Sequence, residues 1–252
     1  MYNLIDGFIL NRKNVLEYDK IATIYTLQLG KIKVLFKGIN KITSKSISYT
    51  EPATEVELQV VKLKNKNYDT IFKFAGGKIV NFNQQLRKSF RIYEYTCKIL
   101  DLIDALTLEL MKDENKYFLI KRVFEFLPNS KNLELIFLAF AFRFIKLCGY
   151  MPELSRCIKC KRVLNSSAYF FFFDFINRGI ICKECRNISS DLRIIEISLD
   201  TIKVIQKFYK LNAEQIDNLN VENKILKEIS NFTFIYLQQY LNRGLKVFQY
   251  EN

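Results

Sequence analysis

The sequence predicts an α+β protein with three parts: an N-terminal five-stranded barrel of the OB-fold type, an α-helical core domain and an inserted four-cysteine zinc ribbon. Three observations predict it. The first 80 or so residues are β-rich runs, apolar residues then recur at helical spacing, and two Cys-x-x-Cys pairs lie late in the chain. The predicted domains are residues 1–80 for the barrel, 81–154 and 188–252 for the helical domain, and 155–187 for the ribbon.

Five runs favour strands, and they comprise residues 8–10, 21–29, 31–37, 54–63 and 68–74. Gly30 allows a tight turn between the second and third runs. In the third run Ile32, Val34 and Phe36 alternate with lysines, which indicates a half-buried strand with a basic outer face. Five short strands in this length suit an OB-fold, a barrel that commonly binds nucleic acid.

Positive charge gathers in two places. The chain carries a formal net charge of +13, and residues 31–45 contain five lysines and no acid. Residues 155–193 add eight basic residues against three acidic ones. This distribution predicts a polyanionic partner, and hydroxyl and lysine donors in the loop after Gly38 suit phosphate contacts. A Lys-rich composition bias and a solvated loop are the alternatives.

From Asn83 the pattern becomes helical. One segment reaches Asp113, with a stripe of Leu86, Phe90, Tyr93, Cys97 and Leu100. Further helices are expected at 117–127, which ends at Pro128, and at 133–147, 199–209 and 223–241. The segment 133–147 is apolar nearly all round, so it should be the centre of the helical core. Cys97 and Cys148 are interpreted as small core residues.

Cys157, Cys160, Cys182 and Cys185 form two Cys-x-x-Cys knuckles separated by 21 residues, in a chain without histidine. Four thiolates can complete a tetrahedral shell with no position left for water, so we expect one structural zinc ion per chain. Two disulfides or four unrelated core cysteines are the alternatives. The N-terminus lacks the pattern of a secretory signal, and no apolar run approaches the roughly 20 residues of a membrane span. We therefore expect a reducing cytosol, where thiols persist.

A dense aromatic run lies between the knuckles. Tyr169 to Phe175, followed by Asn177-Arg-Gly179 and a short apolar stretch, predicts a hairpin that returns the second knuckle to the first. Phe170 to Phe173 could stack on bases or pack against the helical core. Core packing is favoured, because a module of about 30 residues cannot bury so many aromatic rings by itself.

Several enzyme classes lack their motifs. Without histidine there is no Ser-His-Asp or Cys-His pair, and neither a G-x-x-x-x-G-K-[ST] nor a G-x-G-x-x-G loop occurs. An ATP-driven or nucleophilic enzyme is therefore not expected. A metal-dependent nuclease built from scattered carboxylates stays open as a weaker hypothesis.

Several segments follow one another in a fixed order along the chain: Thr26–Gly30 leading into Lys31–Gly38, then Arg143, then Leu147–Leu154 running into Cys157, then Gly179 before Cys182, and Leu241–Lys246. In this order they resemble the RecO family of bacterial recombination mediators. The segment Leu147–Leu154 together with the four cysteines is the specific part of the match, whereas the barrel and the last helices match only as patterns.

The resemblance implies a non-enzymatic, cytoplasmic and nucleoid-associated protein. Such a protein binds single- and double-stranded DNA, anneals complementary strands, joins RecR and helps to load RecA on DNA coated with single-strand-binding protein. The residues expected to contact phosphates are Arg12, Lys13, Lys31, Lys33, Lys37, Lys41 and Lys45. Arg143 is implied as the receiver of the acidic C-terminal tail of single-strand-binding protein, or else is an ordinary helix-surface arginine. An RNA-binding or transcription accessory factor with a zinc ribbon is the competing hypothesis.

Overall fold

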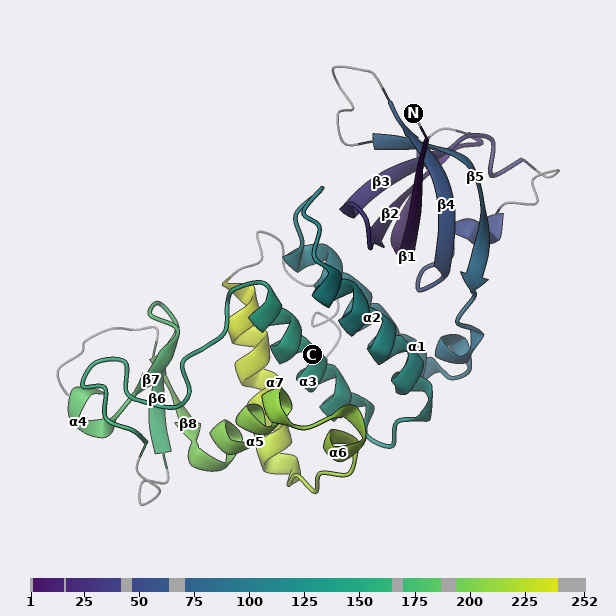
Figure 1. Cartoon of the computed structure of the whole chain (residues 1–252). Coiled ribbons are helices and arrows are strands. Elements are labelled where there is room, and N and C mark those ends of the chain that lie inside the picture. Colours follow the sequence, from purple (N-terminus) through teal and green to yellow (C-terminus); the bar gives the residue numbers. More distant parts are fainter. Residues whose placement is uncertain are drawn as a thin grey trace. The chain divides into compact units, whose positions relative to one another are not determined.

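The computed structural model describes residues 2–15, 17–41, 47–63, 71–164, 170–186 and 194–239. These residues form two compact units. The barrel unit comprises the described residues up to Asn129, and the ribbon unit those from Ser130 to Gln239. The first two α-helices belong to the same unit as the barrel (Figure 1).

The barrel has five strands: β1 (Tyr2–Asn14), β2 (Lys20–Thr26), β3 (Gly30–Phe36), β4 (Glu55–Lys62) and β5 (Ile71–Asn81). They close in the order β1-β2-β3-β5-β4, with β3 and β5 parallel and the other pairs antiparallel. The predicted OB-fold barrel is thereby confirmed, although β1 is far longer than the expected run of residues 8–10. A short 3-10 helix, η1 (Ile47–Thr50), lies between β3 and β4.

The centre of strand β1, from Ile5 to Leu10, is largely buried on both faces. Ile5 and Ile9 belong to the closely packed core inside the barrel. Phe8 lies outside the barrel, where its ring centroid is 5.3 Å from that of Tyr117 and 5.5 Å from that of Phe124. Because apolar neighbours occupy both sides, β1 carries consecutive apolar residues rather than a strict alternation.

The helices of the barrel unit are α1 (Phe90–Leu106) and α2 (Glu114–Phe126), with the 3-10 helices η2 (Gln84–Arg87) and η3 (Leu127–Asn129) at the flanks. Polar contacts fasten them to the strands. Asp104, near the end of α1, accepts hydrogen bonds from Asn11 of β1 and Lys31 of β3. Glu55 of β4 accepts a hydrogen bond from Lys121 of α2 at 2.8 Å.

The prediction of one helix from Asn83 to Asp113 was wrong at both ends. The Ser89 hydroxyl accepts a hydrogen bond from the Ile92 backbone N–H at 3.2 Å, so a capped helix begins only at Phe90. The predicted stripe was wrong at Phe90, which is 84% exposed, and at Tyr93, which is 39% exposed, whereas its members Leu86 and Leu100 are buried. The buried apolar residues of α1 are Tyr95, Ile99, Leu100, Leu102 and Ile103.

In the ribbon unit, α3 (Leu133–Leu147) is the central helix, as predicted, and 11 of its residues are buried. It packs against α5 (Leu199–Lys210), α6 (Ala213–Asp217) and α7 (Asn223–Gln238). The Asp217 carboxylate accepts hydrogen bonds from the Ser130 hydroxyl and from the backbone N–H groups of Lys131 and Asn132. This contact joins α6 to the start of α3. The sequence contains no apolar pattern that predicted α6.

The ribbon contains a small sheet of β6 (Phe170–Asp174), β7 (Gly179–Ile181) and β8 (Ile194–Ser198), in the order β7-β6-β8. The predicted hairpin is confirmed as β6–β7, and β8 was not anticipated. Phe171, Phe173 and Phe175 are buried, and the Phe173 ring lies 4.8 Å from that of Phe232 in α7. Core packing is therefore confirmed for these three rings, whereas Phe170 is 52% exposed.

Throughout the described ranges, no helix combines the length and the apolarity that crossing a bilayer requires.

Gly30, at the turn between β2 and β3, has a φ of +70°, and a Cβ there would overlap the backbone carbonyl of Met111. We expect Gly30→Ala to destabilise the protein by the roughly 1–2 kcal/mol of a left-handed L-residue, plus the cost of this overlap. Urea unfolding measures this loss of stability. Gly149→Ala is the matched control, because Gly149 has a φ of +80° but open space around a Cβ. Equal losses in the two variants would contradict close packing at Gly30.

Candidate metal centre and nucleic-acid interface

The first knuckle is a tight turn closed by backbone hydrogen bonds. The Lys161 N–H donates to the Cys157 carbonyl, and the Cys157 N–H donates to the Arg162 carbonyl, both at 2.9 Å. Lys161 adopts a left-handed conformation with a φ of +63°, which reverses the chain directly after Cys160. Both thiols of the knuckle are therefore directed to one side of the turn.

The second knuckle follows β7, with Cys182 just before the short helix α4 (Lys183–Arg186) and Cys185 within it. Backbone bonds attach β7 to the first knuckle, since the Ile158 N–H donates to the Ile180 carbonyl at 2.8 Å. Gly179 permits this approach, because a Cβ there would overlap the Ile158 side chain and press on Glu153. The hairpin thus carries the second knuckle to the first.

The four Sγ atoms of Cys157, Cys160, Cys182 and Cys185 lie within 4.8 Å of one another, and those of Cys160 and Cys182 are 3.7 Å apart. Four sulfurs at about 2.3 Å from a tetrahedral zinc ion would be about 3.8 Å apart. Burial acts to raise the pKa of the Cys157 thiol, but backbone N–H donors led by Cys160 and Cys182 outweigh it and lower the pKa to about 6. The cluster can hold a metal ion, and its four residues are not unrelated core cysteines.

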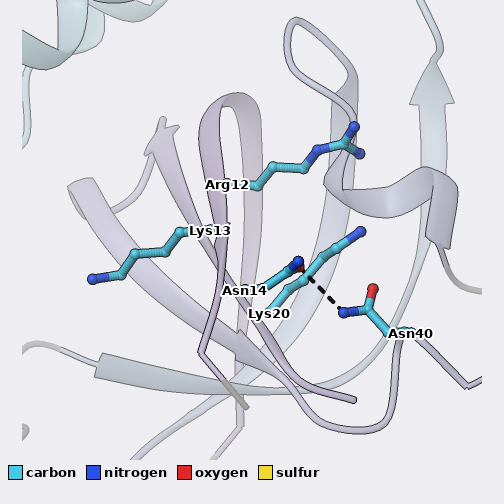
Figure 2. A pocket seen from close by; sticks show the side chains of 5 residues that line it. All are labelled: Arg12, Lys13, Asn14, Lys20 and Asn40. Carbon is cyan, nitrogen blue, oxygen red and sulfur yellow. Dashed lines mark hydrogen bonds between the residues drawn. The ribbon is translucent and has the colours of Figure 1, made fainter. Parts of the chain in front are cut away.

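A basic surface lies at one end of the barrel. Arg12, Lys13 and Asn14 of β1, Lys20 of β2 and Asn40 line a hollow of about 350 Å³ (Figure 2). The strand register brings these residues together, because Asn14 pairs with Lys20 and Lys20 pairs with Phe36. Lys37, the next residue after Phe36, therefore lies at the same end. We name Arg12, Lys13, Lys20, Lys37 and Lys41 the barrel-end basic patch.

The loops around this patch are tied together. The Gly38 N–H donates to the Asp19 carboxylate at 2.7 Å, and the Asn40 N–H donates to the Tyr18 carbonyl at 3.0 Å. The Lys41 ammonium lies 5.8 Å from the centre of the Tyr18 ring. The loop is thus anchored as far as Lys41. Lys45, the last of the predicted phosphate contacts, lies outside the described residues.

Positively charged side chains lie close together within the patch. Lys20 is only 9% exposed, and its pKa is lowered by burial and by the nearby Arg12 guanidinium, with Glu51 acting in the opposite direction. Arg12 forms an ion pair with Glu51. A polyanion bound in the hollow would relieve the repulsion between these cations. Lys20 was missed from the sequence, where only its position opposite Asn14 in a β-hairpin could have indicated it.

Lys31, at the other end of β3, and Lys33, at the middle of the strand, are engaged within the unit. Lys31 is 9% exposed, and its ammonium donates to the Asp104 carboxylate at 3.1 Å and to the Asp104 carbonyl at 2.5 Å. Lys33 forms an ion pair with Glu109. The predicted basic outer face of β3 was therefore wrong at Lys31, because the segment after α1 covers it and the Leu110 N–H donates to the Lys31 carbonyl.

Arg143 of α3 lies at the C-terminal end of α5. Its Nε donates to the Phe208 carbonyl at 2.6 Å, and its Nη2 donates to the Leu211 carbonyl. A cation here complements the negative end of the α5 dipole. The side chain remains half-buried.

The fold and its sites define a class of protein: an OB-fold barrel with a basic end, joined in one chain to a helical unit that carries a four-cysteine ribbon. The comparisons with known proteins give this class a name. The profile described as recombination protein O N terminal matches residues 1–75, and that described as recombination protein O C terminal matches residues 87–247. The chain belongs to the recombination protein O (RecO) family.

Two relatives match this chain along nearly its whole length. The DNA repair protein RecO of Caldicellulosiruptor bescii is 22% identical over 244 residues, which cover 97% of this chain and 95% of that protein. The DNA repair protein RecO of Pelotomaculum thermopropionicum is 26% identical over 245 residues, 97% of this chain and 91% of that protein.

Lys31 should act on stability rather than on ligand binding. Lys31→Ala leaves the Asp104 carboxylate, whose side chain is 13% exposed, without its ion pair, so we expect a loss of about 3 kcal/mol in the free energy of unfolding. Lys13→Ala, at an exposed position of the patch, should change it by less than about 0.5 kcal/mol. Urea unfolding of both variants tests the difference, and an unchanged stability of Lys31→Ala would refute the structural role.

Proposed function

We propose that this chain is a non-enzymatic DNA-binding mediator of recombination and repair. The observation that carries the proposal is the barrel-end basic patch, which gathers five cations at one end of an OB-fold in a chain of the RecO family. Phosphate contacts of this kind need positive charge and little fixed geometry. Binding should therefore track the backbone of single- and double-stranded DNA without reading base sequence.

The described residues also support a non-enzymatic role. Within the described ranges, the four cysteines are the only group of three or more potential metal ligands, so carboxylates do not gather there as they do in a two-metal nuclease. Next to the patch, Glu51 is engaged with Arg12, and Asp19 accepts a hydrogen bond from the Gly38 N–H. We infer that the barrel binds DNA and does not cleave it.

We infer that the four-cysteine cluster holds one zinc ion with a structural role. Zinc accepts four thiolates in tetrahedral geometry, and the sulfur spacing suits it. Bound there, zinc would supply the cross-link between the two knuckles. With four thiolate ligands it would have no position for water and no part in a hydrolytic reaction.

The mediator role also implies protein partners, which we propose from the family. A RecR-like protein and the acidic C-terminal tail of single-strand-binding protein would join this chain, and together they would promote loading of RecA. We place the acidic tail at Arg143, because its half-buried guanidinium at the end of α5 can meet a carboxylate beside apolar residues.

Reversing charge in the patch should weaken DNA binding. Lys13→Glu combined with Lys41→Glu should reduce affinity at least tenfold at low salt, and each lost phosphate contact should lower the slope of log affinity against log salt by about 0.9 for duplex. Fluorescence anisotropy measures both. The control is Lys112→Glu, since Lys112 is exposed and lies beside the Gly30 turn, at the far end of the β2–β3 hairpin. Equal loss in the control would argue against a localised site.

Strand annealing tests the function directly. Complementary fluorescent single strands coated with single-strand-binding protein should anneal faster with this protein than without it, without nucleotide, and the acceleration should vanish at high salt. Labelled DNA incubated with magnesium or manganese should stay intact. Preference for RNA in a matched competition would instead favour the transcription or RNA-binding alternative, and absence of both annealing and DNA binding would overturn the proposal.

Loss of one ligand should release the zinc. Wild-type protein should contain one zinc per chain by elemental analysis, and Cys157→Ser and Cys182→Ser should each lose it and unfold the ribbon at lower temperature. Cys148→Ser is the control, because Cys148 is a half-buried cysteine of the same unit outside the cluster. Stoichiometric zinc in both ligand variants would exclude the assignment.

A further inference from the structure

Three aromatic rings are exposed where the barrel meets α1. Phe82 follows the end of β5 and is 37% exposed, Phe90 opens α1 and is 84% exposed, and Tyr93 lies one helical turn later and is 39% exposed. Figure 1 shows β5 leading through η2 into α1. We name these three residues the aromatic cluster.

The local structure fixes the positions of Phe82 and Phe90. The Arg87 guanidinium lies over the Phe82 ring, 4.5 Å from its centre, and donates hydrogen bonds to the Phe82 and Pro52 carbonyls. Phe82 is thereby fixed against the barrel. Phe90 is the first residue of a helix capped by Ser89, and the packed face of that helix begins only at Tyr95. Its ring is therefore left in solvent by the position of the cap.

The surroundings of the cluster are positively charged. Between Asn81 and Ile92 the sequence contains Arg87, Lys88 and Arg91 and no acidic residue. Lys88 and Arg91 are exposed. Two acids beside the cluster, Glu94 and Glu51, form ion pairs with Lys98 and Arg12. Exposed rings interleaved with cations match nucleic acid, whose bases offer flat apolar faces and whose phosphates offer negative charge.

The aromatic cluster adjoins the barrel-end basic patch. Arg12 of the patch pairs with Glu51, and the neighbouring Pro52 carbonyl accepts a hydrogen bond from Arg87. Burial is the main cause that lowers the pKa of Arg87. The nearby Arg12 cation lowers this pKa further, and Glu51 raises it. The two surfaces therefore lie close together within one compact unit.

We propose that the aromatic cluster, with Phe90 as its principal ring, is a base-stacking platform for single-stranded DNA whose phosphates continue onto the barrel-end basic patch. This inference rests on the proposed function and deepens it. In a duplex the bases are paired and stacked on each other, so only an unpaired strand can offer a base to Phe90. The patch binds both forms of DNA, and the platform adds a preference for the single strand.

Removal of the Phe90 ring should weaken the binding of single-stranded DNA and not the binding of duplex DNA. Base–aromatic stacking is worth about 1–3 kcal/mol per base, so Phe90→Ala should weaken single-strand binding about 5-fold to 150-fold and leave duplex binding unchanged. Phe90→Leu should behave like Phe90→Ala, because it keeps apolar area but loses the flat ring. Phe118→Ala is the control, since Phe118 is an exposed ring of the same unit, 46% exposed, on α2.

A direct probe is available because the chain contains no tryptophan. Phe90→Trp introduces one indole, whose emission should be quenched by an oligothymidylate strand and not by a duplex. Phe118→Trp should respond to neither. Quenching at position 90 together with the single-strand loss in Phe90→Ala would support the platform.

Three results would overturn the platform. They are equal losses on single strand and duplex in Phe90→Ala, full single-strand affinity in Phe90→Leu, and emission in Phe90→Trp that single strands leave unchanged. Full Phe90→Leu affinity would point instead to an apolar contact, as in a protein-docking surface. If wild-type protein binds DNA while Phe90→Ala is unaffected, the platform alone fails. If wild-type protein binds neither form, the proposed function fails with it.

Discussion

Asp104 is the constraint on which the barrel unit depends. Its carboxylate, near the end of α1, accepts hydrogen bonds from Asn11 at 3.0 Å and from Lys31 at 3.1 Å, so one acid joins two strands of the barrel to a helix. The segment that follows α1 then lies along the start of β3, where the Leu110 N–H donates to the Lys31 carbonyl. Because this end of the β2–β3 hairpin is covered, Lys31 pairs with Asp104 of the same unit, and Lys33 at the middle of β3 pairs with Glu109. The cations available to a polyanion gather at the opposite end of the hairpin.

That division localises the DNA-binding surface that we propose on a barrel with many lysines. Net positive charge attracts nucleic acid from any direction, but a bound phosphate is held only where several donors converge. The register of β1, β2 and β3 and the bonds between Asp19, Tyr18 and the loop after Gly38 produce that convergence. The aromatic cluster beside it offers a different chemistry, flat apolar faces. This difference is why we propose that the two surfaces together bind both parts of a nucleotide.

The ribbon unit is organised by two different means. On one side, backbone bonds between the first knuckle and β7 assemble four thiols whose mutual repulsion as thiolates only a cation can offset. On the other side, Phe171, Phe173 and Phe175 supply the apolar contact that such a small module lacks by itself, with Phe173 against Phe232 and Tyr236 of α7. The four thiols are thus held by backbone hydrogen bonds, and the sheet behind them by aromatic packing.

The sequence by itself determined the features that depend on spacing and composition. The two Cys-x-x-Cys pairs indicated the metal cluster, the continuous apolar run indicated α3, five β-rich runs indicated the barrel, and the order of these parts indicated the family. Only the tertiary structure decided which lysines face solvent and which face an acid distant in sequence, because Lys31 and Asp104 are brought together by folding alone. It also decided that Tyr95, Ile99 and Ile103 of α1 are buried while Phe90 and Tyr93 are exposed, since both sets have helical spacing. Local patterns set the elements, and long-range contacts select among the faces that each element offers.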